Sequence, residues 1–241
     1  MKEADTPRAS FYKIPLGLSS GWYNISMSFR KVVFAPEEYY HIYNRGNSKQ
    51  RIFLDDGDYD RFVKLLYLCN SDLNINFRDV VGSVENIYKY DRGDEKVNIG
   101  AYCLMPNHFH ILVREKEENN ISAFMKKLAT AYVMYFNKKY ERTGGLFEGK
   151  FKAQHVTENN HLKYLFSYIY LNPLKILDPK WKTEKIKNTQ KFYQFISRYP
   201  HSSYQTILNK TDQLKLLNLK AFPGYFVTPQ EYKSELFDWL T

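Results

Sequence analysis

The sequence predicts an α+β fold in which an antiparallel sheet carries its helices on one face. Short segments rich in aromatic and β-branched residues alternate with segments whose apolar residues recur at helical spacing, which indicates that strands and helices are mixed along the chain. The apolar fraction of 44% is sufficient for a packed core in a chain of 241 residues. These observations exclude a disordered chain.

Six segments form the predicted core. We expect a strand over residues 39–44, a helix over 58–68, strands over about 98–104 and 108–114, a helix over about 121–140 and a strand near 150–156. The order strand, helix, strand, strand, helix, strand is that of a ferredoxin-like sandwich. Residues 70–97 are polar and are expected to form a long loop or insertion.

A further helix is predicted from about residue 158 to the residue before Pro173, because proline cannot continue a helix. On a helical wheel its apolar stripe consists of Leu162, Leu165, Phe166 and Ile169. Tyr168 and Asn172 lie one turn apart beside that stripe, so a phenol and an amide can face a common site. The alternative is that Tyr168 is an amphipathic residue at the rim of the core.

The chain divides into three predicted regions. Residues 1–26 are rich in Ser, Gly and Pro without sustained periodicity, and we expect an N-terminal extension there. Residues 27–180 hold the predicted sheet and its helices, including the helix with Tyr168. Residues 181–241 mix helical and loop segments and are expected to form an appended C-terminal extension.

The charge balance favours a polyanionic partner. Thirty-five Lys and Arg face 26 Asp and Glu, which leaves a net charge of +9. Aromatic residues make up 17% of the chain, and rings interleaved with cations suit unpaired nucleic acid because any base can stack on them. The alternative is a basic protein without such a partner.

Cysteine content and hydropathy bear on the compartment. The two cysteines form no CxxC pair, which argues against disulfide scaffolding and a thiolate zinc site. No apolar run approaches the roughly 20 residues needed to cross a bilayer, and we find no secretory signal. We therefore expect a cytoplasmic protein without a membrane partner.

The segment His108-Phe109-His110 carries the clearest chemical signal. Side chains alternate along a strand, so both imidazoles point to one face while Phe109 points to the other. Two neighbouring imidazoles on a rigid strand make half of a divalent-metal site. The alternative is a pair of polar residues on the solvated face of a half-buried strand.

Tyr168 offers a nucleophile that would use such a site. A phenol is mostly protonated at neutral pH, and a divalent cation can polarise a phosphodiester and stabilise the charge that develops during attack. The amide oxygen of Asn172 could serve as a third ligand beside His108 and His110. This donor set suits Mg²⁺ or Mn²⁺.

These segments together resemble the insertion sequence 200-like group of single-tyrosine transposases. Residues 105–110 (Met-Pro-Asn-His-Phe-His) resemble its HUH motif, and residues 168–173 (Tyr-Ile-Tyr-Leu-Asn-Pro) resemble its tyrosine helix. Three further segments are similar to the REP-associated tyrosine transposase branch, namely residues 40–46 (Tyr-His-Ile-Tyr-Asn-Arg-Gly), 145–152 (Gly-Leu-Phe-Glu-Gly-Lys-Phe-Lys) and 202–204 (Ser-Ser-Tyr). The resemblance covers roughly residues 27–225.

The resemblance implies a ferredoxin-like fold and metal-dependent cleavage of single-stranded or hairpin DNA through a 5′-phosphotyrosine. It assigns Tyr168 as the nucleophile and His108 and His110 as metal ligands, with Asn172 where related enzymes place a polar third ligand, often Gln. By motif position and charge, Arg45, Lys150 and Lys152 are candidate phosphate contacts. The resemblance leaves open whether the protein acts as a monomer or a homodimer, since related enzymes can exchange the tyrosine helix between subunits.

Two alternative functions compete with this one. A histidine-triad nucleotide hydrolase needs a third histidine where this chain has Leu112, which argues against that class. A domesticated binder that holds palindromic repeat DNA or RNA without cutting it would not need His108, His110 and Tyr168 together. Their joint presence therefore favours retained catalysis.

Overall fold

The computed structural model describes residues 32–181, 183, 186 and 188–240, so the predicted extension over 1–26 lies outside the described residues. The sheet and the helices on it are β1 (Tyr39–Arg45), α1 (Asp56–Cys69), β2 (Val97–Met105), β3 (His108–Glu115), α3 (Asn120–Lys139), β4 (Lys152–Val156) and α4 (Asn159–Leu171). The remaining helices are α2 (Phe77–Val80), α5 (Leu174–Leu177), α6 (Thr189–Arg198), α7 (Ser203–Asn209) and α8 (Pro229–Asp238), with 3-10 turns η2 (Asn47–Lys49), η3 (Ile87–Lys89), η4 (Asp212–Leu216) and η5 (Leu219–Ala221). None of the helices in this described part is long and apolar enough to cross a membrane.

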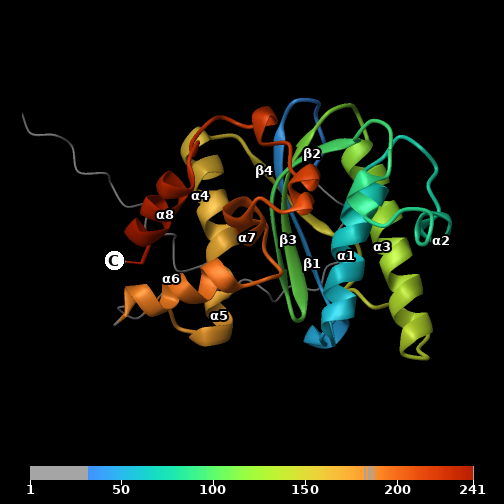
Figure 1. Cartoon of the computed structure of the whole chain (residues 1–241), viewed down its shortest axis with the longest axis horizontal. Coiled ribbons are helices and arrows are strands. Elements are labelled where there is room, and N and C mark those ends of the chain that lie inside the picture. Colours follow the sequence, from blue (N-terminus) through green and yellow to red (C-terminus); the bar gives the residue numbers. More distant parts are fainter. Residues whose placement is uncertain (1–31, 182, 184–185, 187, 241) are drawn as a thin grey trace, which may run out of the picture. The chain divides into compact units, whose positions relative to one another are not determined.

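The four strands form one antiparallel sheet in the order β2-β3-β1-β4. In chain order the core reads β1, α1, β2, β3, α3, β4, which is the ferredoxin-like arrangement. Helices α1 and α3 lie together on one side of the sheet, and α4 lies on the other (Figure 1). The predicted fold class is confirmed, including the additional helix that carries Tyr168.

Strand alternation sorts the side chains into two apolar clusters. Tyr40 and Ile42 of β1 join Phe109 and Ile111 of β3 in the cluster beneath α1 and α3. The alternate residues of these two strands point to the opposite face of the sheet, where Leu112 of β3 packs with the apolar stripe of α4. The face that carries the odd-numbered residues of β1 and the even-numbered residues of β3 is therefore the one that α4 covers.

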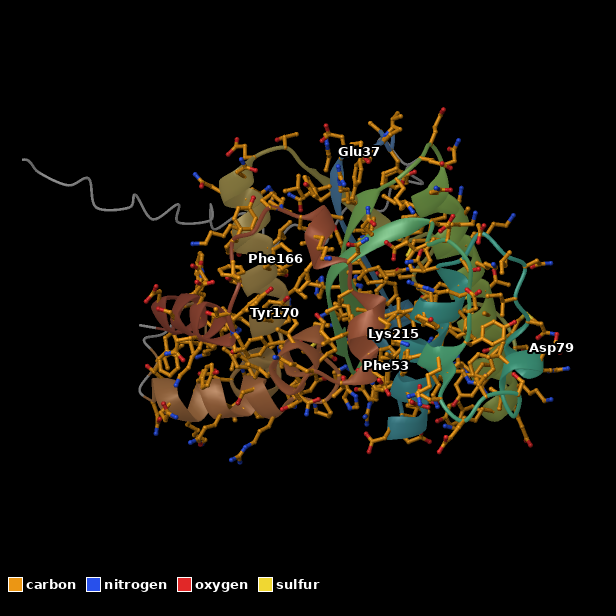
Figure 2. The ribbon with its side chains drawn as sticks, turned by 45° about the horizontal axis from the view of Figure 1, so that its top comes forward. Glu37, Phe53, Asp79, Phe166, Tyr170 and Lys215 are labelled. Atoms are coloured by element: carbon orange, nitrogen blue, oxygen red, sulfur yellow. The ribbon has the colours of Figure 1, made fainter. Side chains whose placement is uncertain are left out.

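The C-terminal region packs on α4 and on the edge of the sheet. The ring of Tyr170 of α4, labelled in Figure 2, packs in a tilted arrangement against that of Tyr204 of α7, with 5.3 Å between the ring centroids. The backbone N–H of Leu104 on β2 donates to the carbonyl of His201 (2.9 Å), so residues around 201–203 cover a strand edge that would otherwise be exposed. Residues Val32–Thr241 form one compact unit, and the predicted boundary after residue 180 stays a prediction.

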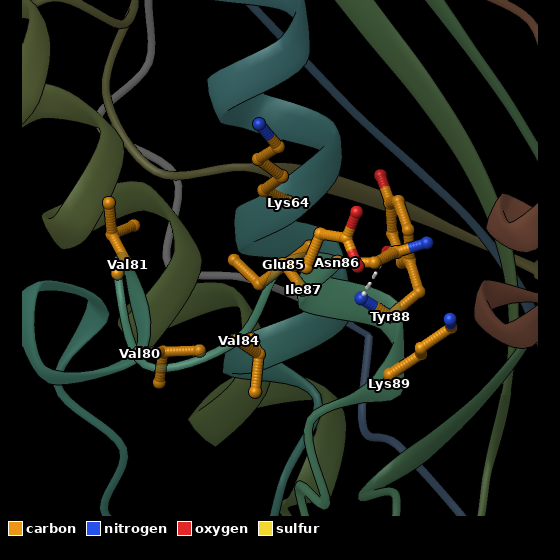
Figure 3. Close-up of a pocket in the computed structure, with 10 residues that line it drawn as sticks. Lys64, Val80, Val81, Val84, Glu85, Asn86, Ile87, Tyr88 and Lys89 are labelled. Carbon is orange, nitrogen blue, oxygen red and sulfur yellow. Dashed lines mark hydrogen bonds between the residues drawn. The ribbon is translucent and has the colours of Figure 1, made fainter.

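The segment 70–97 connects α1 to β2 and contains α2 and η3, so it is an insertion with two short helical turns. Together with Lys64 of α1, the residues of its stretch 80–89 other than Ser83 line a pocket of about 630 Å³ (Figure 3). This pocket contains none of the predicted site residues.

A buried carboxylate joins α1 to α3. Asp58 is completely buried and accepts hydrogen bonds from the backbone N–H of Leu54 (2.8 Å) and from the hydroxyls of Tyr140 (2.8 Å) and Tyr135 (3.0 Å). The ammonium of Lys139 lies 2.8 Å from the same carboxylate. Burial alone would raise the pKa of Asp58, but Lys139 and the donated hydrogen bonds outweigh burial, and the pKa is lowered.

Asp58→Asn is expected to lower the free energy of unfolding by about 3 kcal/mol, because it removes the charge that compensates Lys139 and replaces an acceptor with a donor. Urea unfolding at pH 7 measures this loss. The lowered pKa means that Asp58 stabilises the fold above the usual carboxyl range, and that this contribution disappears as the pH falls below about 4. The variant should therefore show a weaker acid dependence than the wild type.

Asp60→Asn is the matched control, since Asp60 is exposed and pairs with Lys64 one turn away at the surface of α1. It should change the free energy of unfolding by no more than about 0.5 kcal/mol. Equal losses in the two variants would contradict a special role for the Asp58 network.

Candidate active site

The turn between β2 and β3 holds His108 at a fixed position. The carbonyl of Pro106 accepts hydrogen bonds from the backbone N–H groups of Ile52 (2.8 Å) and Phe53 (3.2 Å), and that of Asn107 accepts one from Gly46 (2.8 Å). A Cβ at Gly46 would overlap the carbonyl of Gln50, so glycine is needed for this close approach. The chain after β1 thus clamps the turn that begins β3.

His108 and His110 project from the same face of β3, as their spacing predicts. Their ring centroids are 5.0 Å apart with the rings perpendicular. His110 is 6% exposed, while His108 is half-buried. Burial lowers the pKa of His108 to about 4, and the charges of Lys175 and Arg45 act in the same direction, so this imidazole is neutral at pH 7 with a lone pair to share.

Helix α4 brings Tyr168 to these histidines within a single chain. The Tyr168 ring lies 5.6 Å from that of His110 in an edge-to-face arrangement. The phenol is half-buried, and burial raises its pKa although the side chain of Asn172 opposes the shift. Tyr168 is thus protonated at neutral pH and needs positive charge nearby to act as a nucleophile.

Asn172 caps the C-terminal end of α4 and is only 1% exposed. The helical wheel places it beside the buried face, which is wrong, because the chain continues past Pro173 directly into the buried start of α5. Its amide nitrogen donates to the carbonyl of Tyr168 (2.9 Å), whereas its Oδ1 is buried and has no hydrogen-bond partner within the described residues. This oxygen has a lone pair available for a ligand.

Two residues that the sequence interpretation did not single out belong to the same face. His41 and Tyr43 on β1 point toward α4, and Tyr43 pairs directly with His110 in the register of the two strands. The Nε2 of His41 lies 2.9 Å from the Nδ1 of His110, and the two rings stack at 5.0 Å. The strand pairing that brings His41 to His110 joins residues 69 apart, so no local pattern could have revealed it.

Lys175 on α5 is a third residue that the sequence interpretation missed. Its ammonium lies 5.9 Å from the centre of the Tyr168 ring. Burial lowers its pKa. The break at Pro173 interrupts helical periodicity, so a wheel drawn for α4 cannot place it.

The predicted phosphate contacts differ in their surroundings. Arg45 lies opposite His108 in the pairing of β1 with β3 and forms a bidentate ion pair with Glu148, with 3.0 Å between Nη2 and Oε1. Lys150 and Lys152 are exposed, and Lys152 pairs with Tyr43 across β1 and β4, on the face that carries the histidines. The assignment of all three to phosphate binding stays a prediction.

The domain is thus a ferredoxin-like sheet whose histidine-bearing face is covered by a helix that carries a tyrosine. A model of the IS200-like transposases matches residues 37–172, which is more than half of the chain and includes the strands, the histidine pair and the tyrosine helix. The chain belongs to the IS200-like transposase family. The family prediction is therefore confirmed.

Solved structures resemble this chain at low sequence identity. A REP-associated tyrosine transposase bound to a REP hairpin is 12% identical over 84% of this chain and 92% of its own, with a TM-score of 0.44. A candidate transposase from Deinococcus radiodurans R1 is 16% identical over 58% of this chain and 93% of its own (TM-score 0.33). The tRNA(His) guanylyltransferase of Saccharomyces cerevisiae is 11% identical over 87% of this chain and 75% of its own (TM-score 0.32). Among curated proteins, none matches.

Proposed function

We propose that the protein is a REP-associated tyrosine transposase that cleaves and rejoins single-stranded DNA at hairpin-forming repeats through a 5′-phosphotyrosine. The observation that carries the proposal is the position of the Tyr168 ring, 5.6 Å from His110 in the same chain. A nucleophile next to a pair of neutral metal-ligand candidates is what phosphodiester transfer to a tyrosine requires. Because both groups belong to one chain, the geometry favours action in cis.

The chemical step transfers a phosphodiester from deoxyribose to Tyr168. The phenolic oxygen forms a bond to phosphorus as the bond to the 3′ oxygen breaks, and the proton lost by the phenol is balanced by the proton gained by the released 3′-OH. Attack of that 3′-OH, or of another, on the phosphotyrosine reverses the step. Rejoining needs no external energy source, because the phosphotyrosine conserves the energy of the broken bond.

The residues present fit a divalent cation. No cluster of three or more His, Cys, Asp and Glu in the part of the chain that the structure describes could hold a metal ion, so the donor set must include another group. His108 and His110 would supply two imidazole nitrogens, and the buried Oδ1 of Asn172 would supply an oxygen. Mixed nitrogen and oxygen ligands suit Mn²⁺ and Mg²⁺. When bound, such a cation would polarise the phosphate and stabilise the charge that develops in the transition state.

Lys175 supports the reactivity of the phenol. Burial opposes ionisation of Tyr168, and a cation 5.9 Å from the ring centre favours the phenolate electrostatically. The same ammonium is available to a phosphate oxygen placed next to Tyr168. We therefore assign to Lys175 the stabilisation of negative charge on the phenolic oxygen of Tyr168 and on the phosphate during the transfer step.

The basic residues around the end of β1 are proposed to hold the DNA backbone. Arg45, Lys49 and Lys152 all act electrostatically on Glu148, which places three cations around one carboxylate close to the start of β3. Phosphates arriving there would meet Lys150 and Lys152 at the surface. The net charge of +9 supports the same partner.

The decisive experiment incubates the full chain with a hairpin that carries a short single-stranded flank, in the presence of Mn²⁺. We expect a covalent protein–DNA adduct on a denaturing gel, and peptide mapping should place it on Tyr168. Tight hairpin binding without any adduct would instead favour a domesticated binder that holds repeats without cutting them.

DNA affinity is expected to fall steeply with salt, because each neutralised phosphate releases counterions. Replacing Lys150 and Lys152 with Gln should weaken binding and reduce the slope of log affinity against log salt by roughly 0.7–0.9 for each phosphate that the variant no longer neutralises. Fluorescence anisotropy with a labelled hairpin from 50 to about 200 mM salt measures both quantities.

Lys126 and Lys138 provide the matched control pair. Both are exposed on α3, which covers the opposite face of the sheet. The doubly substituted control removes the same charge and should leave the slope close to that of the wild type. Equal slopes in the two double variants would contradict phosphate binding by Lys150 and Lys152.

A further inference from the structure

His41, on the adjacent strand β1, contacts the ring of His110. The hydrogen bond between the Nε2 of His41 and the Nδ1 of His110 is 2.9 Å long and buried, and His41 is only 5% exposed. The His41 ring is held in place by ring contacts on two sides, with Tyr43 at 5.1 Å and the edge of Tyr168 at 5.8 Å. Its orientation is therefore fixed by packing.

A hydrogen bond between two imidazoles requires that one ring donates and the other accepts. Both rings of this pair are buried, with His41 5% and His110 6% exposed, and burial disfavours a charged imidazole. If His41 donates, the Nδ1 of His110 is the acceptor, and a neutral His110 then carries its proton on Nε2 and cannot ligate a metal through that atom. If His110 donates from Nδ1, its Nε2 carries a lone pair.

We infer that His41 is a positioning residue: its Nε2 accepts the Nδ1–H of His110 and holds His110 in the tautomer whose Nε2 can bind a divalent cation. The inference rests on the proposed metal role of His110. A metal-bound imidazole generally donates its other N–H to a fixed acceptor, which sets the tautomer and orients the ring. Here the acceptor is an imidazole instead of the more usual carboxylate or carbonyl.

His41 also contacts the proposed nucleophile. His41 contacts both His110 and Tyr168, so one side chain on β1 orients the metal-ligand candidate and packs against the phenol. Changing His41 should therefore alter cation affinity through His110, without removing any group that the proposed function assigns to the metal or the DNA.

The direct test is nitrogen NMR of the metal-free protein labelled with ¹⁵N-histidine. The inference expects His110 in the Nδ1–H tautomer and His41 with an unprotonated Nε2. The Nε2–H tautomer at His110 in the wild type would overturn the inference. This readout needs neither metal nor DNA, so it decides the inference even if the cleavage proposal fails.

Two substitutions give a second readout by Mn²⁺ titration, followed by electron paramagnetic resonance. His41→Leu removes the acceptor, and we expect Mn²⁺ affinity to fall about 10–100-fold. His41→Gln retains an acceptor oxygen and should recover most of that loss. Unchanged affinity in His41→Leu would overturn the inference, while formation of the Tyr168 adduct by the wild type would leave the proposed function standing.

His155→Leu is the matched control. His155 is on β4 and stacks on Tyr40, on the opposite face of the sheet from His110. It should leave Mn²⁺ affinity and the His110 tautomer unchanged. If His41→Leu does not fold, the wild-type tautomer and the His41→Gln affinity still decide the inference.

Discussion

Tyr168→Phe is expected to abolish covalent capture of DNA and to leave hairpin affinity within about twofold of the wild type. Phenylalanine keeps the ring that packs against His110 and Tyr164, so the fold of α4 and the DNA surface are preserved. It removes only the oxygen that would attack phosphorus. Loss of a nucleophile with the rest of the site intact lowers the rate by roughly 10⁴-fold or more.

Single-turnover cleavage of a labelled hairpin, resolved on a denaturing gel, measures this loss. Tyr164→Phe is the matched control, because Tyr164 lies one turn earlier on α4 and its ring packs against that of Trp239 at 5.0 Å. The control should form the adduct at close to the wild-type rate. An undiminished adduct in Tyr168→Phe would exclude this residue as the nucleophile.

The fold was predictable because its signals are local. The aromatic alternation of β1, the turn at Pro106 and the helical spacing in α3 each lie within one segment, and the order of the segments then selects the ferredoxin-like sheet. The histidine pair was predictable for the same reason, since two residues apart on one strand share a face. Tyr168 was placed near it by the motif resemblance, because wheel geometry alone favours a rim residue.

The missed parts of the site depend on contacts between distant segments. His41 meets His110 only through the register of β1 with β3, which no short pattern encodes. Lys175 reaches Tyr168 because the chain turns at Pro173, and the same turn buries Asn172. The ion pair of Arg45 with Glu148 likewise joins a strand end to a loop about a hundred residues later.

The second large effect is expected from His108→Ala, which should lower Mn²⁺-dependent cleavage roughly 10²–10³-fold while hairpin binding is retained. The side chain is half-buried and hydrogen-bonds to the neighbouring Asn107 side chain (2.6 Å), which stays near solvent, so its removal opens no large cavity. Cleavage and Mn²⁺ affinity should fall together, because both depend on the same imidazole nitrogen.

His110→Ala should show the same catalytic loss with an added cost in stability. His110 is buried and hydrogen-bonded to His41, so truncation leaves a buried imidazole nitrogen without its partner, which costs about 1–3 kcal/mol. Thermal unfolding separates the two effects: His108→Ala should unfold close to the wild type, and His110→Ala at a lower temperature. Full cleavage by either variant, or by the wild type in excess EDTA, would contradict a metal at this histidine pair. If both variants lose cleavage to the same extent but only His110→Ala loses stability, both imidazoles bind one cation and His41 supports His110 alone.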